Sequence, residues 1–247
     1  DSGDLRLVQG CRRAAGRRSA GRLAIAVRGN ARKTPLDCIS DYTNSSKSCF
    51  GRKNLKKKMY KLYIDDNPME IDLDAALGAM TEQRRTKVMA FKHEQGRKLS
   101  AAAYMLLCKA LREEYGINEA PLFEYSEHGK PAIVGHPEIF FNMSHCRSVA
   151  ACVVSSSPVG VDVEEVREFK KSLARYVLND EEYSMISSAP QPDREFIRLW
   201  TMKESCLKLT GEGITRDLKT VLVDTAKYHF DTQQFGSAIL TVCSFFI

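Results

Sequence analysis

The segment Gly-Val-Asp-Val-Glu at residues 160–164 alternates apolar and acidic side chains. This period of two predicts a β-strand, because successive side chains of a strand point to opposite faces. Asp162 and Glu164 then share one face, and Val161 and Val163 share the other. Two neighbouring carboxylates repel each other unless a cation lies between them. The strand therefore indicates either a cation site or an ordinary solvent-exposed acidic face.

A helix is expected over residues 194–209, where apolar residues recur at helical spacing. Its apolar stripe consists of Phe196, Leu199, Trp200 and Leu207. Lys203 falls in the middle of this stripe, while Glu204 lies beside it and Lys208 follows Glu204 by one turn. A lysine within an apolar stripe can extend its ammonium to water. Alternatively, this part of the helix faces a cleft, and the lysine binds an anion there.

Together the strand and the helix offer three carboxylates and two lysines. Hard cations such as Mg²⁺ bind oxygen ligands and often bridge substrate phosphates, so Asp162, Glu164 and Glu204 are candidate metal ligands. Lys203 and Lys208 could neutralise phosphate oxygens and a leaving group. This inventory indicates phosphoryl-type transfer rather than a binding module. The chain has no Walker-type G-x-x-x-x-G-K-[ST] segment and no kinase signature, so the common nucleotide-binding folds are not supported.

Charge is distributed unevenly along the 247 residues. The formal net charge is +6, but residues 1–58 alone carry a net +11, and the remainder carries −5. The basic leader, residues 1–58, is rich in Arg, Gly and Ser and cannot bury enough apolar surface to offset its ordering entropy. We expect a disordered extension preceding a natural start at Met59. The alternative is an arm that binds nucleic acid or a membrane surface.

The apolar runs and the cysteines indicate the cellular compartment in which the protein is expected. The longest apolar runs, at residues 101–108 and 149–154, are far shorter than the roughly 20 residues of a membrane span. No two of the eight cysteines form a C-x-x-C pair, so a zinc or redox motif is not expected. We expect a soluble, cytoplasmic protein whose cysteines are free thiols.

The hydrophobic periodicity predicts an α+β fold with mostly antiparallel sheet, in two halves at residues 59–157 and 158–247. Asn179 is an expected N-cap that forms a capping box with Glu182, and Gly116 and Gly211 are expected to end helices. The other expected helices cover 81–92 and 98–115. Strands are expected at 59–64, at 140–145 and 149–155 as a hairpin, and at 160–166, 220–224, 228–231 and 238–246, with a strand-and-turn region at 124–134.

Four motifs in order resemble the signature of the 4′-phosphopantetheinyl transferases of the longer, Sfp-like type. Residues 159–164 match the pattern (V/I)-G-(V/I)-D-(V/I)-E, and residues 200–208 match W-x-x-K-E-(S/A)-x-x-K. Upstream, Gly-Lys-Pro at 129–131 and Phe-Asn-Met-Ser-His at 141–145 match two further family segments. The resemblance extends from Met59 to the C-terminus, and the leader has no counterpart.

The resemblance implies a pseudo-dimer of two similar α+β halves, with the active site between them. Such an enzyme moves the phosphopantetheine arm of coenzyme A to a serine of an acyl or peptidyl carrier protein and releases 3′,5′-ADP. It depends on Mg²⁺, with Mn²⁺ as the other candidate ion. Because both halves of the site belong to one chain, we expect a monomer, with neither nucleic acid nor membrane among its partners.

The motif positions also imply roles for individual residues. Asp162, Glu164 and Glu204 would hold the metal on the pyrophosphate, and Glu204, directly or through a metal-bound water, would act as the base for the attacking serine. Lys208 would neutralise or protonate the departing phosphate, with Lys203 as adjacent support.

Five further positions are implied as coenzyme contacts. Lys130, Ser144 and His145 would contact the phosphates of coenzyme A, although a histidine at a strand end can also be purely structural. Arg85 and Lys98 match a loosely defined basic region that holds the 3′-phosphate in relatives. Both would equally suit a solvated helix face.

A carrier protein is expected to be acidic, so an acidic enzyme body needs a local basic patch to attract it. The expected docking surface consists of Lys170, Lys171 and Arg175 with Phe169, Leu173, Tyr176 and Val177. Two other functions remain open at this point. One is a different Mg²⁺-dependent phosphohydrolase or nucleotidyl transferase that uses the same ligands, and the other is a nucleic-acid-binding protein that uses the basic leader.

Overall fold

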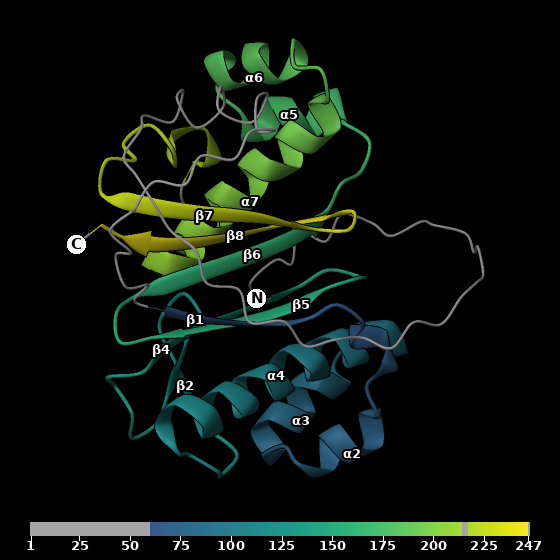
Figure 1. Ribbon diagram of the computed structural model, residues 1–247, viewed down its shortest axis with the longest axis vertical. Helices are drawn as coiled ribbons and strands as arrows, with labels where there is room; N and C mark the ends of the chain where they lie inside the picture. Colours follow the sequence, from purple (N-terminus) through teal and green to yellow (C-terminus); the bar gives the residue numbers. More distant parts are fainter. Residues whose placement is uncertain (1–59, 214–216, 247) are drawn as a thin grey trace, which may run out of the picture.

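The computed structural model describes residues 60–213 and 217–246, so the expected leader at residues 1–58 lies outside the described residues. Four layers follow one another in Figure 1: helices, a sheet, a second sheet and further helices. The first two layers contain β1 (Tyr60–Asp65), the 3₁₀ turn η2 (Pro68–Glu70), α2 (Leu73–Gly78), α3 (Glu82–Met89), α4 (Glu94–Tyr115), β4 (Phe140–His145) and β5 (Ala150–Ser155). A small sheet of β2 (Phe123–Tyr125) and β3 (Pro131–Ile133) lies beside them.

The other two layers come from the C-terminal part of the chain. They contain β6 (Val159–Glu165), α5 (Lys171–Val177), α6 (Asp180–Ser187), α7 (Pro192–Thr210), the 3₁₀ turn η4 (Leu218–Thr220), β7 (Tyr228–Phe235) and β8 (Ala238–Phe245). In the described residues, no helix has the length and apolarity needed to cross a membrane.

Both three-stranded sheets are antiparallel and share one strand order. The first sheet runs β1-β5-β4, and the second runs β6-β8-β7. In each sheet the strand that comes last in the chain lies in the middle, and helices separate the first strand from the closing hairpin. This arrangement confirms the expected α+β class with antiparallel sheets and the expected β4–β5 hairpin.

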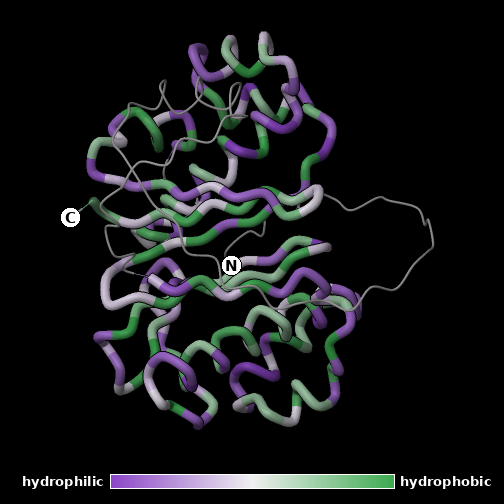
Figure 2. The backbone as a smooth tube through the Cα atoms, in the orientation of Figure 1, coloured by the Kyte–Doolittle hydropathy of each residue, from purple (hydrophilic) through white to green (hydrophobic). Residues whose placement is uncertain are grey.

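Buried apolar side chains fill the spaces between the layers. One cluster joins α4 to the first sheet through residues such as Leu107 and Tyr63, and another joins α7 to the second sheet through residues such as Cys206. A third cluster lies between the two sheets, where Leu62 and Val153 meet Val161. Figure 2 shows hydrophobic residues along the strands on both sides of this contact. Each fully buried aliphatic side chain contributes about 1.5–3 kcal/mol, so the sheet-to-sheet contact is strongly favoured.

The helix boundaries follow the expected capping chemistry. Asn179 accepts a hydrogen bond from the Glu182 amide at 2.9 Å through Oδ1, and the Glu182 carboxylate accepts one from the Asn179 amide at 3.0 Å. The predicted capping box at the start of α6 is therefore confirmed. Gly116 and Gly211 end α4 and α7 in the left-handed conformation, with φ of 70° and 75°, as glycine at these positions predicts.

One predicted strand, at residues 220–224, is wrong. The chain forms the turn η4 there, because the Asp217 side chain accepts a hydrogen bond from the Lys219 amide at 3.0 Å and the Asp217 carbonyl accepts one from the Thr220 hydroxyl at 2.8 Å. Val221 and Leu222 are buried in the α7 core cluster. Their apolar pattern therefore reflects contact with the core rather than sheet pairing.

Gly160 allows α7 to pack directly on β6. A Cβ atom at this position would lie 2.1 Å from the Ser205 carbonyl oxygen and 2.6 Å from the Leu209 amide nitrogen. Both contacts are with helix backbone, which cannot move aside as a flexible side chain can. The glycine of the strand motif is thus required by the close approach of helix and strand.

Replacing Gly160 by Ala should lower the free energy of unfolding by about 3 kcal/mol, the upper part of the usual cost of overpacking. Urea denaturation followed by circular dichroism measures this loss. Gly78→Ala is the matched control, because a Cβ at Gly78 meets nothing within 4 Å, and its effect should stay below about 1 kcal/mol. Equal stability of the two variants would contradict the packing argument.

Candidate active site

Side chains of β4 hydrogen-bond to the edge of β6 that is not paired with β8. The Val161 amide donates to Asn142 Oδ1 at 3.0 Å, and the Val163 amide donates to Ser144 Oγ at 3.4 Å. Asn142 and Ser144 share a face of β4 because they are two residues apart. Backbone donors at an open strand edge need such partners when they are buried. This junction brings the Phe-Asn-Met-Ser-His segment against the acidic strand.

Asp162 lies at the centre of the junction and is only 4% exposed. Its Oδ1 accepts hydrogen bonds from Lys208 Nζ at 2.7 Å and from Ser144 Oγ at 2.9 Å. Lys208 Nζ also donates to Ser144 Oγ at 2.9 Å, so the three side chains form a closed triangle. Asp162 Oδ2 is buried and has no hydrogen-bond partner among the described residues. An unpartnered buried carboxylate oxygen is costly, which indicates that a further cation or donor belongs beside it.

Two more carboxylates lie within electrostatic reach of Asp162. Burial, followed by the negative charge of Asp162, raises the pKa of Glu164 to about 7 and that of Glu204 to about 7. Arg167 opposes the shift at Glu164 through an ion pair of 3.0 Å. The three carboxylates therefore form one cluster whose negative charge Lys208 and Arg167 only partly neutralise.

The donor set of this cluster fits a hard divalent cation. It consists of carboxylate oxygens, which such cations prefer, and one of them is the buried, unpartnered Asp162 Oδ2. In residues 60–213 and 217–246 no three such side chains already surround one point that a metal ion could occupy. In this arrangement the Lys208 ammonium is the cation in contact with Asp162.

His145 lies at the end of β4, beside the cluster. Burial, then the positive charges of Lys208 and Arg84, lower the pKa of His145 to about 4. The imidazole is therefore neutral at physiological pH, and two cations act on it from different elements. An anion at this position would be electrostatically favoured.

From the sequence, Arg85 was expected to contact the coenzyme, and its neighbour Arg84 was not. Arg84 is 6% exposed, and its Nη2 donates to the carbonyl and hydroxyl oxygens of Ser100 at 2.7 and 2.9 Å. Its guanidinium also lies over the Tyr104 ring, 5.2 Å from the centroid. The available signal was the spacing of Arg84 and Val88, since residues four apart share one helix face and both are buried.

Lys130, in the turn between β2 and β3, reaches the far end of the same helix that carries Lys208. Its Nζ donates to the Leu209 carbonyl oxygen at 2.7 Å. A cation is stabilised at the C-terminal end of a helix by the helix dipole. Lys130 contacts Leu209, Ser144 contacts Lys208, and the charge of Lys208 acts on His145, so all three residues lie toward the end of α7.

Comparison with known proteins identifies the family. Residues 158–243 match the model of the 4′-phosphopantetheinyl transferase superfamily. A 4′-phosphopantetheinyl transferase of Bacillus subtilis is 31% identical over 170 residues, which cover 67% of this chain and 75% of the relative. The transferase Sfp of Bacillus subtilis strain 168 is 26% identical over 179 residues, covering 71% and 79%. The chain belongs to the 4′-phosphopantetheinyl transferase superfamily.

HetI of Nostoc, another 4′-phosphopantetheinyl transferase, is 28% identical over 160 residues, which cover 61% of this chain and 67% of the relative. Membership of the superfamily supports phosphopantetheinyl transfer as the activity of this enzyme. Asp162, Glu164, Glu204 and Lys208 lie within the residues that match the family model, whereas Lys130, Ser144 and His145 precede them.

Three residues expected in the site have other partners in this transferase. Arg85 donates from Nε to the Leu77 carbonyl at 3.1 Å at the end of α2, and Lys98 pairs with Glu94 one turn earlier on α4 at 3.3 Å. These contacts are local and do not bring either side chain to the carboxylate cluster. Lys203 has a partner in a different element of the fold.

Lys203 is 1% exposed and faces the interior of the C-terminal half. Its Nζ donates to Glu182 at 2.8 Å and to the Leu218 carbonyl at 2.7 Å. The anion that Lys203 contacts is therefore Glu182 of α6, inside the protein and not in a cleft. These contacts join α6, α7 and η4, and the supporting role that the resemblance implies for Lys203 stays a prediction.

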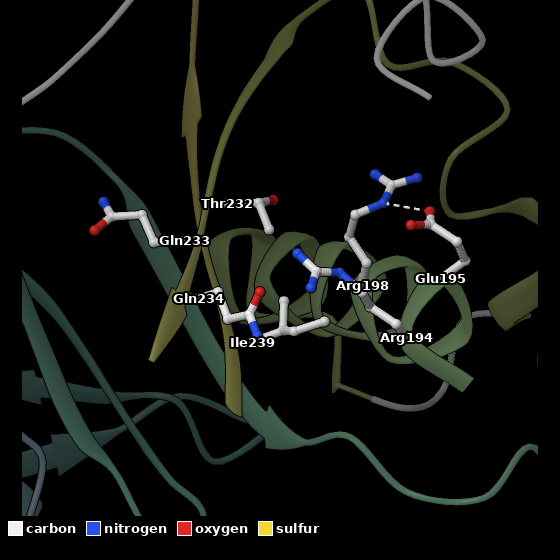
Figure 3. A pocket seen from close by; sticks show the side chains of 7 residues that line it. All are labelled: Arg194, Glu195, Arg198, Thr232, Gln233, Gln234 and Ile239. Carbon is white, nitrogen blue, oxygen red and sulfur yellow. Dashed lines mark hydrogen bonds and ion pairs between the residues drawn. The ribbon is translucent and has the colours of Figure 1, made fainter. Parts of the chain in front are cut away.

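A small surface pocket lies elsewhere on the transferase. Figure 3 shows it between the first turns of α7 and the β7–β8 hairpin, where the Arg198 guanidinium turns toward Glu195. It is lined by Arg194, Glu195, Arg198, Thr232, Gln233, Gln234 and Ile239. It contains none of the expected site residues.

Replacing Lys203 by Met should lower the free energy of unfolding by about 3–5 kcal/mol, because the Glu182 carboxylate loses its charge partner in a largely buried setting. Thermal and urea denaturation measure this change. Lys109→Met is the control, since Lys109 pairs with Glu113 on the surface of α4, and its loss should cost below about 1 kcal/mol. A Lys203→Met protein as stable as the control would rule out the joining role.

Proposed function

We propose that this transferase moves the 4′-phosphopantetheine arm of coenzyme A to a serine hydroxyl of an acyl or peptidyl carrier protein. The reaction depends on Mg²⁺, or on Mn²⁺ in its place, and releases 3′,5′-ADP. The observation that carries the proposal is Asp162, whose Oδ1 is held by Lys208 and Ser144 while its buried Oδ2 has no partner in the described residues. Such a group suits a divalent cation next to a polyphosphate.

Asp162, Glu164 and Glu204 would hold the metal ion. The ion would supply positive charge that neutralises the pyrophosphate of coenzyme A during transfer. Phosphoryl-type transfer needs positioning and charge neutralisation more than covalent help from the protein. The half-buried Glu164 and Glu204, with their raised pKa values, meet this need, because repulsion among the carboxylates favours binding of a cation.

Glu204 would act on the attacking serine, and Lys208 would act on the departing phosphate. The serine oxygen attacks the phosphorus that carries the pantetheine arm, and Glu204 accepts the serine proton. A carboxylate is a suitable general base when it lies within hydrogen-bond reach of the hydroxyl whose proton it accepts. The bond from this phosphorus to the oxygen of 3′,5′-ADP breaks, and the Lys208 ammonium neutralises the departing phosphate.

Coenzyme A would bind against β4 and the end of α7. Lys130, Ser144 and His145 are the proposed phosphate contacts, and the buried Arg84 adds a positive charge next to His145. Ser144 has a second task in this arrangement, because its hydroxyl already bridges Asp162 and Lys208. Arg85 and Lys98 are the proposed contacts of the 3′-phosphate, and each also makes a local contact within the helical layer.

The two sheets support a pseudo-dimer with the reaction centre between its halves. Their strand orders are equivalent, and the candidate site lies where β4 of one sheet meets β6 of the other. A single chain would then supply both halves of the site, and we propose that the enzyme works as a monomer in the cytoplasm.

An acidic carrier protein would dock on α5 and the residues before it. Lys170 and Lys171 are exposed, and Tyr176 is 60% exposed. Val177, which the sequence placed on this surface, is fully buried in the α7 core cluster and is removed from it. Arg175 lies over the Tyr183 ring at 3.7 Å, which holds α5 against α6.

Asp162→Asn should reduce transfer by about 100-fold or more, the scale of losing one preorganised charge contact in an active site. Mass spectrometry of an apo carrier protein incubated with coenzyme A and Mg²⁺ detects the added arm on its serine. Asp74→Asn, on the exposed first turn of α2, is the matched control with full activity. Chelation by EDTA should stop transfer, and Mg²⁺ should restore it. Transfer that persists in EDTA would argue against metal dependence.

Charge reversal at Lys170 and Lys171 to Glu should raise the KM for the carrier protein by about tenfold and leave the KM for coenzyme A unchanged. The physical reason is lost attraction between opposite charges at the docking surface. A Lys92→Glu/Lys227→Glu variant changes the net charge equally at exposed positions away from α5. An unchanged carrier KM, or an equal rise in this control, would exclude the proposed surface.

A further inference from the structure

Asn142 is a buried polar residue of β4 that has no role in the reaction described above. It is 8% exposed, and its Oδ1 accepts the hydrogen bond from the Val161 amide at 3.0 Å. The donor belongs to the other sheet, 19 residues along the chain. The contact therefore joins two sheets rather than neighbouring strands of one sheet.

The position of this bond along β6 is what matters. Asp162 is flanked by Val161 and Val163, and the amides of both donate to side chains of β4. On its other edge β6 pairs with β8, where Asp162 lies opposite Thr241. The backbone on both sides of Asp162 is thus held from two directions. The position of this backbone therefore determines where the Asp162 side chain lies.

The two β4 side chains are not equivalent. Ser144 Oγ accepts from the Val163 amide at a long 3.4 Å and is also engaged with Asp162 and Lys208. Asn142 makes the shorter bond to β6 and is not part of the hydrogen-bonded triangle of Asp162, Ser144 and Lys208. Met143, between them, packs on the opposite side against the α4 core cluster. Asn142 is therefore placed to fix β6 without taking part in its chemistry.

We propose that Asn142 is a positioning residue, whose amide oxygen fixes the β6 backbone at Val161 and so keeps Asp162 aligned with Ser144 and Lys208. Loss of this acceptor lets β6 shift, and the affinity of the carboxylate cluster for a divalent cation falls. The inference rests on the proposed function for its effect on transfer. Its effects on the Val161 amide and on Mn²⁺ binding do not depend on that function.

The central variant is Asn142→Leu, which has a similar shape and no acceptor. Asn142→Asp keeps an oxygen acceptor at the same position, and Asn118→Leu is the matched control because Asn118 is exposed beyond α4. Full-length proteins are compared under conditions where urea titration shows each to be folded. Three quantities are measured: amide hydrogen exchange at Val161, the Kd for Mn²⁺ alone by electron paramagnetic resonance, and kcat and KM for transfer.

Asn142→Leu should speed exchange of the Val161 amide about tenfold, weaken Mn²⁺ binding about tenfold and lower kcat by a similar factor, with the KM for the carrier protein unchanged. Asn142→Asp should restore all three to within about threefold, and Asn118→Leu should match the wild type. If Asn142→Leu does not fold, Asn142→Ala replaces it in the same measurements.

The proposal is overturned if a folded Asn142→Leu protein keeps wild-type Mn²⁺ affinity and loses only stability, since Asn142 would then be purely structural. It is also overturned if Asn142→Asp behaves like Asn142→Leu, because the acceptor would not be the decisive feature. If no variant, the wild type included, transfers the arm, the proposed function fails. The exchange and Mn²⁺ measurements still decide the role of Asn142 in that case.

Discussion

The hydrogen bonds between β4 side chains and the open edge of β6 are the constraint on which the rest of the site depends. The apolar cluster between the sheets holds them together, but such packing is non-directional and does not fix one register. Two directed bonds, from Val161 to Asn142 and from Val163 to Ser144, fix the position of β6. Only then can Asp162 meet Ser144 and Lys208, which come from β4 and α7. Apolar packing thus stabilises the contact between the sheets, and the directed hydrogen bonds fix the position of one sheet relative to the other.

The carboxylates of the site repel one another, and this repulsion favours the binding of a cation. Burial and the charge of Asp162 raise the pKa of both Glu164 and Glu204 to about 7, so the protein would be more stable with fewer acids here. Buried charges are retained at functional sites although apolar replacements would often stabilise the fold. Lys208 neutralises one carboxylate directly. The negative charge that remains on the carboxylates favours binding of a divalent cation, and that cation can in turn bind a phosphate-bearing substrate.

Burial and long-range partners explain why several side chains lie where the sequence did not place them. Arg85 and Arg84 are adjacent and chemically alike, yet only Arg84 points inward toward Ser100. Lys203 sits in the motif as expected, but the fold supplies Glu182, a residue 21 positions earlier, as its partner. Val177 was grouped with exposed basic residues and is buried instead. In each case the residue type was informative, but its partner lies far away in the sequence and no local pattern specifies it.

The sequence by itself determined the strand that carries Asp162 and Glu164, the helix that carries Glu204 and Lys208, and the family resemblance, because periodicity and motif spacing are local properties of the chain. It also indicated the glycine at position 160. Only the tertiary structure decided why that glycine is needed, which arginine is buried, and that Asn142 and Ser144 hold the edge of β6. These features depend on how the two sheets and α7 approach one another. Such an approach is set by the packing of side chains from distant segments, which the order of residues along the chain does not display.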